Sequence, residues 1–175
     1  MQPDELRLTL MRHAEADLAP LGEPDLARPL TNRGSTFARQ RGQQLAREGM
    51  VPDQILCSDA ERTLLTARHL LAGAKERRPV LLLPALYDSN SDTILALTRE
   101  HADELAGHVM VVAHNPGAAD AAALLAAGDS GTVGAIDRFP PGTAATFTIA
   151  GGEWAGLSPR KARLERLMYP SDGDQ

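Results

Sequence analysis

The chain has 175 residues, of which 43% are hydrophobic but only 3% aromatic, and a formal net charge of −5. Its length fits one domain with an aliphatic core, and its negative charge argues against a nucleic-acid binder, which would show a basic stripe with interleaved aromatic residues. No apolar run approaches the roughly 20 residues of a membrane span, and the acidic N-terminus lacks the features of a signal peptide. We therefore expect a single cytoplasmic domain over residues 1–175, with a frayed tail over 169–175 and no binding to nucleic acid or membranes.

Short apolar runs mark the expected strands. Four of them cover residues 6–11 (LRLTLM), 54–57 (QILC), 80–83 (VLLL) and 109–113 (VMVVA). Continuous apolar runs of this length are typical of strands that are buried on both faces. A C-terminal antiparallel hairpin is predicted over residues 144–157 (AATFTIAGGEWAGL), with Gly151 and Gly152 as its turn.

Between these strands, small and apolar residues recur at helical spacing. The three stripes contain Ala38, Gly42, Leu45 and Gly49, then Ala60, Leu64, Ala67 and Leu71, then Ile94, Leu97, His101 and Leu105. Strands that alternate with helices predict a three-layer α/β/α sandwich with a mostly parallel central sheet. Residues 18–30 and 128–142 show no regular pattern, and we expect them to be loops.

Polar residues stand where the predicted strands end. Ligands of open α/β sheets bind at the carboxyl ends of the strands. Arg12 and His13 end the first strand, Ser58 and Arg62 follow the second, Asp88 follows the third, and His114 ends the fourth. We therefore expect these side chains to meet at one edge of the sheet.

Two helix starts are predicted at the same edge. Ser58–Glu61 (SDAE) fits a capping box, which would leave Arg62 in the first helical turn. In the segment HNPG, Asn115 is the expected N-cap and Pro116 the first helical residue. His114 would then lie beside a helix N-terminus, which favours an anion.

Two arginines, two histidines and a helix N-terminus suit a dianionic tetrahedral group. Arginine binds phosphate oxygens bidentately, and a neutral histidine held among arginines is a nucleophile. Ser58 has two alternative roles, either as a helix N-cap alone or as a phosphate contact. Asn115 is a further candidate for phosphate binding. With a nearby carboxylic acid, these groups can support phosphoryl transfer without a metal or other cofactor.

A metal site is the alternative interpretation of the two histidines. His13 and His114 could coordinate zinc together with Glu15 or Asp88. The neighbouring arginines make that site electrostatically poor, and no local ligand spacing supports it. We therefore expect neither a metal nor a cofactor.

The quoted motifs also resemble a known family. LMRHAEAD (residues 10–17) resembles the RHG signature of the histidine phosphatase superfamily, which includes phosphoglycerate mutases and acid phosphatases. RPLTNRG (28–34), ILCSDAERTLLTA (55–67) and VVAHNPG (111–117) match its further blocks in order and at similar spacing. The nearest likeness is the small branch typified by the phosphohistidine phosphatase SixA, and it extends from residue 8 to about 125.

The resemblance implies a phosphoglycerate mutase-like fold and a set of catalytic roles. His13 would be the nucleophile that forms a phosphohistidine intermediate, and Arg12 and Arg62 would hold the phosphoryl oxygens. His114 would donate to the same group. Asp88, in the segment PALYD, stands where the family's proton donor often lies.

The sequence departs from the family pattern in three places. Ala14 replaces the usual glycine of the signature, and Asp88 is shorter than the usual glutamate. The helical insertion of the larger branches is missing between Asp88 and His114. We therefore expect a shallow, uncovered site, which suits a phosphate displayed on a protein.

These observations predict a metal-independent phosphatase that acts on phosphohistidine of a partner protein. The alternatives are a phosphatase for a small phosphorylated metabolite and, from a different class, a non-catalytic phosphoprotein-binding module. A mutase is less favoured, because it must retain its phosphate in a closed site.

Other conspicuous residues are expected to have structural roles. Glu15 is interpreted as an arginine partner, Cys57 as buried packing, His69 and His101 as structural, and His108 as a solvent-exposed turn residue. The basic segment RKARLER (160–166) is predicted to be a solvated face, with a docking patch for an acidic partner as the alternative.

Overall fold

The computed structural model describes residues 5–128 and 136–170, and a six-stranded sheet forms its centre in the order β3-β2-β4-β1-β5-β6. The strands are β1 (Glu5–Arg12), β2 (Gln54–Cys57), β3 (Val80–Leu82), β4 (His108–Ala113), β5 (Ala144–Ala150) and β6 (Ala162–Met168). The pairs among β1 to β4 are parallel, whereas β5 and β6 pair antiparallel. Most of the tail predicted over 169–175 lies outside the described residues.

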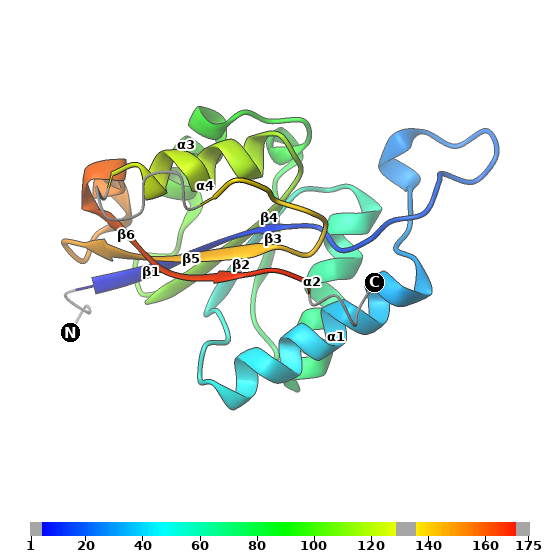
Figure 1. Cartoon of the computed structure of the whole chain (residues 1–175), viewed down its shortest axis with the longest axis horizontal. Helices are drawn as coiled ribbons and strands as arrows, with labels where there is room; N and C mark the ends of the chain where they lie inside the picture. Colours follow the sequence, from blue (N-terminus) through cyan, green and yellow to red (C-terminus); the bar gives the residue numbers. More distant parts are fainter. Residues whose placement is uncertain (1–4, 129–135, 171–175) are drawn as a thin grey trace.

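Four helices cover the sheet, namely α1 (Asn32–Arg47), α2 (Glu61–Ala74), α3 (Ser91–His101) and α4 (Gly117–Ala126). Figure 1 shows α1 and α2 against one face and α3 and α4 against the other. The buried residues accordingly form two clusters, one around Leu8 and Leu125 and the other around Met11 and Ile55. The predicted three-layer α/β/α sandwich is confirmed. None of the helices in the described ranges is long and apolar enough to cross a membrane.

The sequence of β1 explains why its charges lie at its end. Leu6, Leu8 and Leu10 contact the core on the α3 and α4 side, and Met11 points to the opposite face. The strand pairs with β4 on one side and β5 on the other, so it has no solvent-exposed edge. Glu5 and Arg7 are exposed at the start of the strand, and the charged residues of the motif follow only where the strand leaves the core.

Two glycines allow α1 and α2 to pack backbone against backbone. A Cβ atom at Gly42 would lie 1.8 Å from the carbonyl oxygen of Leu70. A Cβ atom at Gly73 would lie 1.9 Å from the carbonyl oxygen of Arg39. Both distances are far below van der Waals contact, so this close approach requires glycine. The contact anchors α2, which carries a site arginine in its first turn.

The third strand differs from its prediction. β3 forms an edge of the sheet and pairs only with β2 among the described strands. Leu81 and Leu82 are 39% and 43% exposed. The apolar run identified the strand, but the expectation that it is buried on both faces is wrong, because an edge strand has a neighbour on one side only.

The C-terminal hairpin is longer than predicted. β5 agrees with the prediction, but the chain then forms two short 3₁₀ helices, Trp154–Gly156 and Pro159–Lys161, before it returns as β6. Trp154 is buried, and its Nε1–H donates to the carbonyl oxygen of Ala106 at 2.9 Å. Gly151 and Gly152 have positive φ values of 106° and 65° where the chain turns, but the returning strand begins only at Ala162. Most of the basic segment lies in the sheet strand β6, where Arg163 and Glu165 are exposed, in agreement with the predicted solvated face.

The third predicted helix also ends early. α3 stops at His101, and Leu105, which was assigned to its apolar stripe, is 85% exposed. The helical spacing of Leu105 is therefore coincidental.

His108 is buried, which corrects the prediction of a solvent-exposed turn residue. It begins β4 and is only 7% exposed, and its Nε2 lies 2.8 Å from Thr9 Oγ1. Thr9 Oγ1 in turn lies 2.8 Å from Thr146 Oγ1, so the three side chains form a buried polar chain across β4, β1 and β5. Burial lowers the pKa of His108 from 6.5 to about 4.

This lowered pKa predicts a loss of stability in acid. The unfolded chain takes up a proton at His108 as the pH falls below 6.5, whereas the folded chain does so only near pH 4. His108 therefore makes its full contribution to the free energy of unfolding above pH 6.5. This contribution decreases as the pH falls towards 4, by about 2 to 3 kcal/mol in total. We expect His108→Gln to show a smaller decrease than the natural chain in urea unfolding between pH 7 and 4.5. If the free energy of unfolding decreased equally in both proteins, His108 would not contribute to the loss of stability in acid.

Candidate active site

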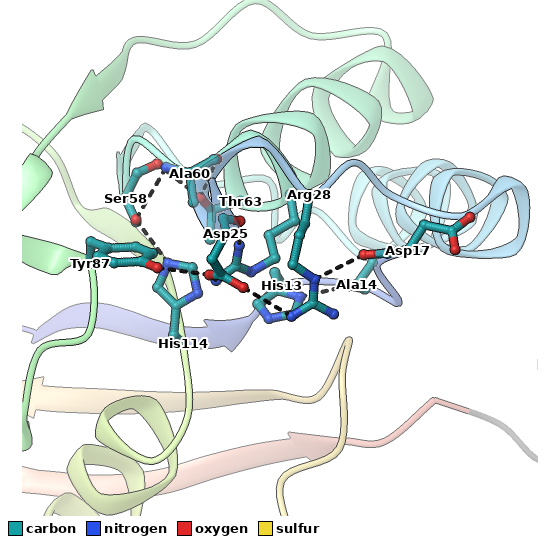
Figure 2. A network of polar contacts seen from close by, with 11 residues as sticks. His13, Ala14, Asp17, Asp25, Arg28, Ser58, Ala60, Thr63, Tyr87 and His114 are labelled. Atoms are coloured by element: carbon teal, nitrogen blue, oxygen red, sulfur yellow. Dashed lines mark hydrogen bonds and ion pairs between the residues drawn. The ribbon is translucent and has the colours of Figure 1, made fainter. Parts of the chain in front are cut away.

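Most of the polar residues predicted to meet collect at the carboxyl edge of the sheet, and Asp88 is the exception. Arg12 and His13 end β1, His114 follows β4, and Arg62 lies in the first turn of α2. The rings of His13 and His114 are 5.4 Å apart between centroids, and Figure 2 shows them side by side. His13, Arg62 and His114 are each less than 9% exposed. These three side chains therefore lie deeper than the shallow site that the sequence predicted.

A hydrogen bond fixes the tautomer of His13. Its Nδ1 lies 2.7 Å from the carbonyl oxygen of Ala14. A carbonyl oxygen can only accept, so Nδ1 carries the hydrogen and donates it. In the neutral ring, Nε2 therefore keeps its lone pair and is the nitrogen available for nucleophilic attack.

His13 is held neutral at physiological pH. Burial is the largest cause and lowers its pKa from 6.5 to about 4, although the bond to Ala14 opposes the shift. The positive charges of Arg62, Arg12 and Arg28 lower the pKa further. The sequence analysis attributed the neutral state of His13 to the charges of the arginines, but burial lowers the pKa of His13 more than these charges do.

Ser58 orients His114 from behind. Ser58 is fully buried, and its Oγ lies 2.8 Å from Nε2 of His114. The Ala60 amide donates to the same Oγ at 3.4 Å, which favours donation of the Ser58 hydroxyl hydrogen to Nε2. The hydrogen of the neutral His114 ring then lies on Nδ1. Burial, followed by the charge of Arg62, lowers the pKa of His114 from 6.5 to about 3.

Both predicted helix caps are wrong. α2 begins at Glu61 with Ala60 as its N-cap, so Ser58 is not the first residue of a capping box. α4 begins at Gly117 with Pro116 as its N-cap. The Asn115 side chain instead donates to the carbonyl oxygen of Phe139 at 2.8 Å. The phosphate contacts predicted for Ser58 and Asn115 stay predictions.

The two arginines leave buried donors without partners. Arg12 Nη1 donates to the carbonyl oxygen of Phe139 at 3.1 Å. Arg62 donates from Nη1 to the carbonyl oxygen of Asp25 at 2.9 Å and from Nη2 to its Oδ2 at 3.0 Å. The Nε atoms of both arginines and Nδ1 of His114 are buried with no hydrogen-bond partner in the described part of the chain. Unpaired buried donors are costly, and an oxyanion is the acceptor that suits such a set.

The loop between β1 and α1 adds two residues that the sequence analysis missed. Asp25 begins a 3₁₀ helix (Asp25–Ala27), and its carboxylate contacts Arg62. Arg28 lies 3.4 Å from the Asp25 carboxylate and donates from Nε to the carbonyl oxygen of Asp17 at 2.9 Å. Figure 2 shows this loop bringing both side chains to the histidines. In the sequence, these two residues were marked only by the spacing of an acid three residues before an arginine, in a loop that contains several prolines.

After β3, Tyr87 reaches the site and its neighbour Asp88 does not. The Tyr87 hydroxyl donates to Asp25 Oδ2 at 2.7 Å, and its ring lies edge-on to His114 at 5.3 Å between centroids. Asp88 is exposed, has a left-handed backbone with a φ of 50°, and makes no hydrogen bond or ion pair within the described residues. The role of proton donor predicted for Asp88 therefore has no supporting contact in this structure.

We accordingly expect Asp88→Asn to leave kcat/KM unchanged for alkyl phosphates, aryl phosphates and phosphohistidine alike. Asp88 is exposed and makes no contact with the site residues, so nothing in the structure orients its carboxyl group towards a leaving group. Initial rates on the three substrate classes test this. A selective loss on alkyl phosphates, whose leaving groups need a proton most, would restore Asp88 as the general acid.

The signature segment is held by its neighbours. The Ala14 amide donates to Thr66 Oγ1 at 3.0 Å, and Ala14 is completely buried, so the methyl group that replaces glycine packs into the core. Glu15 forms an ion pair with Arg33 at 2.6 Å and accepts from Thr31 Oγ1 at 2.8 Å. Glu15 is therefore the arginine partner expected from the sequence.

The arrangement has the components of metal-free phosphoryl transfer. It combines a neutral histidine with a free lone pair, a second neutral histidine, and three guanidinium groups around them. Among the residues that the structure describes, no group of three or more His, Cys, Asp or Glu side chains could hold a metal ion. Attack on phosphorus and stabilisation of the equatorial oxygens are both within reach of these side chains.

Comparisons with known proteins agree with this chemistry. The model of the histidine phosphatase superfamily (branch 1) matches residues 8–130. An uncharacterized protein of Mycobacterium tuberculosis is 32% identical over 165 residues, which cover 91% of this chain and 99% of that protein. A structure assigned as phosphohistidine phosphatase SixA from Nakamurella multipartitia has a TM-score of 0.82 and 30% identity over 97% of this chain and 99% of its own. Its counterpart from Agrobacterium tumefaciens has a TM-score of 0.76 and 25% identity over 94% and 99%.

Proposed function

Because the chain belongs to the histidine phosphatase superfamily, branch 1, and is a phosphatase, we propose that it removes phosphoryl groups from phosphohistidine of a partner protein. The phosphoryl group passes through a covalent phosphohistidine on His13. The observation that carries the covalent step is the hydrogen bond from His13 Nδ1 to the Ala14 carbonyl oxygen, which leaves Nε2 unprotonated. Burial supports it by keeping the ring neutral at pH 7.

The first half-reaction transfers the phosphoryl group to the enzyme. The Nε2 lone pair of His13 attacks phosphorus, and the bond to the leaving group breaks with its electron pair on the leaving atom. Arg12 and Arg62 neutralise the equatorial oxygens, and Nδ1 of His114 donates to one of them. His13 then carries the phosphoryl group on Nε2 and the hydrogen on Nδ1.

The second half-reaction returns His13 to its starting state. Water attacks phosphorus, and the electron pair of the P–N bond returns to Nε2. The hydrogen on Nδ1 stays in place, so both hydrogens of the water leave with the product as dihydrogen phosphate. The ring again has one proton, on the nitrogen that faces Ala14.

A protein substrate is favoured by what surrounds the site. Only α3 and β4 lie between Asp88 and His114, so no helical insertion covers the site there. The side chains of Asp25 and Arg28 are 50% and 33% exposed, which places charged groups at the entrance. A phosphohistidine on a flexible or protruding segment could therefore reach the buried histidines.

A substrate panel tests the proposal. We expect kcat/KM for a histidine-phosphorylated carrier protein to exceed that for phosphorylated sugars and other small esters, with all rates measured in EDTA. The guanidinium groups supply the charge that Mg²⁺ supplies in other phosphoryl-transfer enzymes, so chelation should not lower the rates. A higher value for one small ester would instead favour a metabolite phosphatase. Tight phosphate binding without any turnover would identify a binding module.

A further inference from the structure

The site residues lie at two depths. His13, Arg62 and His114 form a buried floor, each with less than 9% exposure. Asp25, Arg28 and Tyr87 form a rim that solvent reaches. In-line attack places the leaving group opposite the nucleophile. Because His13 attacks from the floor, the leaving group faces the rim.

The rim offers the leaving group a carboxylate. Asp25 Oδ2 accepts from Tyr87 and Arg62 at 2.7 and 3.0 Å. Asp25 Oδ1 has only a long contact of 3.4 Å with Arg28, so it can accept from another donor. The hydrogen bond from Tyr87, followed by the charge of Arg62, lowers the pKa of Asp25. At neutral pH the group accepts hydrogen bonds and has no proton to donate.

We propose that Asp25, oriented by Tyr87, is a leaving-group subsite that selects phosphoryl groups carried on protonated nitrogen over phosphate esters of alcohols. The inference rests on the proposed phosphohistidine phosphatase function and names the residues that would give the site its preference for that substrate. A phosphohistidine ring protonated on its second nitrogen carries a positive charge and an N–H donor, which match the free oxygen of Asp25. An ester oxygen has neither, and its alkoxide would be repelled by the carboxylate.

The transfer needs no proton from the enzyme. His13 Nε2 forms the new bond to phosphorus while the substrate P–N bond breaks. The electron pair of that bond returns to the substrate ring, which leaves as neutral imidazole with its second nitrogen still protonated. Asp25 holds that proton on the ring throughout, which keeps the ring in the form that leaves most easily.

Asp25 also sets the charge of the site. The site has three guanidinium groups, those of Arg12, Arg28 and Arg62. Among the described residues that contact these groups, Asp25 is the one that does so with a carboxylate. Removal of that carboxylate charge should therefore strengthen the binding of inorganic phosphate. This second consequence is independent of the leaving group.

Asp25→Asn tests the subsite with two small probes, phosphoramidate and 4-nitrophenyl phosphate. We expect kcat/KM for phosphoramidate to fall about tenfold or more, and that for the aryl ester, whose leaving group needs no acceptor, to stay within about twofold. Inhibition by inorganic phosphate should become stronger. Tyr87→Phe keeps the ring and removes the orienting hydroxyl. It should lower kcat/KM for phosphoramidate by less than Asp25→Asn does, and leave kcat/KM for the aryl ester unchanged. Glu23→Gln, an equal charge change on an exposed residue of the same loop whose side chain makes no contact within the described residues, is the matched control.

The outcomes separate the two proposals. Equal losses on both probes would overturn the subsite, because Asp25 would then only hold Arg62 in place. Unchanged rates on both would overturn it as well. If the natural enzyme turned over neither probe nor a phosphohistidine protein, the phosphatase proposal would fail together with the inference.

Discussion

We expect His13→Ala to reduce turnover by about 10⁴-fold or more while the fold persists. A backbone carbonyl fixes the tautomer of the His13 ring and leaves its Nε2 unprotonated, and a catalytic nucleophile cannot be replaced by its neighbours. Acid-labile label from a phosphorylated substrate should appear on His13 of the natural enzyme and disappear in the variant. Rates on 4-nitrophenyl phosphate and circular dichroism provide the two measurements.

Matched variants keep this experiment interpretable. His13→Asn retains a side-chain N–H that can donate to Ala14 and should be as inactive as alanine, although it disturbs the buried site less. His69→Ala, on α2 outside the site, should retain full activity. Normal turnover by either His13 variant would exclude the covalent mechanism.

The second large effect is expected for Arg62→Lys. The Arg62 guanidinium contacts Asp25 with two nitrogens and keeps its buried Nε without a partner in the described structure. Lysine is a single point charge and cannot reproduce this fork, so kcat/KM should fall by about 10²-fold or more. The loss should appear on esters and phosphoramidates alike, because the equatorial oxygens are common to both.

Arg68→Lys is the control for this change. Arg68 lies on the same helix, is exposed, and makes no contact with the site within the described residues. Its variant should match the natural enzyme in kcat/KM and in melting temperature. An unchanged kcat/KM for Arg62→Lys would show that Arg62 serves the loop of Asp25 and not the phosphoryl group.

The strands could be predicted from the sequence because their signals are local. The run at 54–57 matches β2 residue for residue, and Arg12 and His13 follow the last core residue of β1 as expected. Burial on both faces leaves such runs with few polar residues, so they are visible without knowledge of their neighbours. The status of β3 as an edge depends on sheet order, which no local run encodes.

The rim of the site could not be predicted, since it depends on loop geometry. Asp25 lies twelve positions after His13 in a segment without periodicity, and only the folded loop brings it to Arg62. Tyr87 and Asp88 are adjacent in sequence, and the left-handed turn at Asp88 decides which of them faces His114. Loop conformation of this kind depends on tertiary contacts more than on residue preference.

The placement of β1 between β4 and β5 has a consequence for biosynthesis. The strand that carries the nucleophile is made first, but its two hydrogen-bonded neighbours begin at His108 and Ala144. Contacts this distant in sequence form slowly, and a ribosome releases residues from the N-terminus onwards. The nascent chain therefore holds His13 without a pocket until most of the polypeptide has emerged. A chain that ends before Ala144 carries His13 but lacks the strand that pairs with β1 on its second side, so we expect it to be inactive.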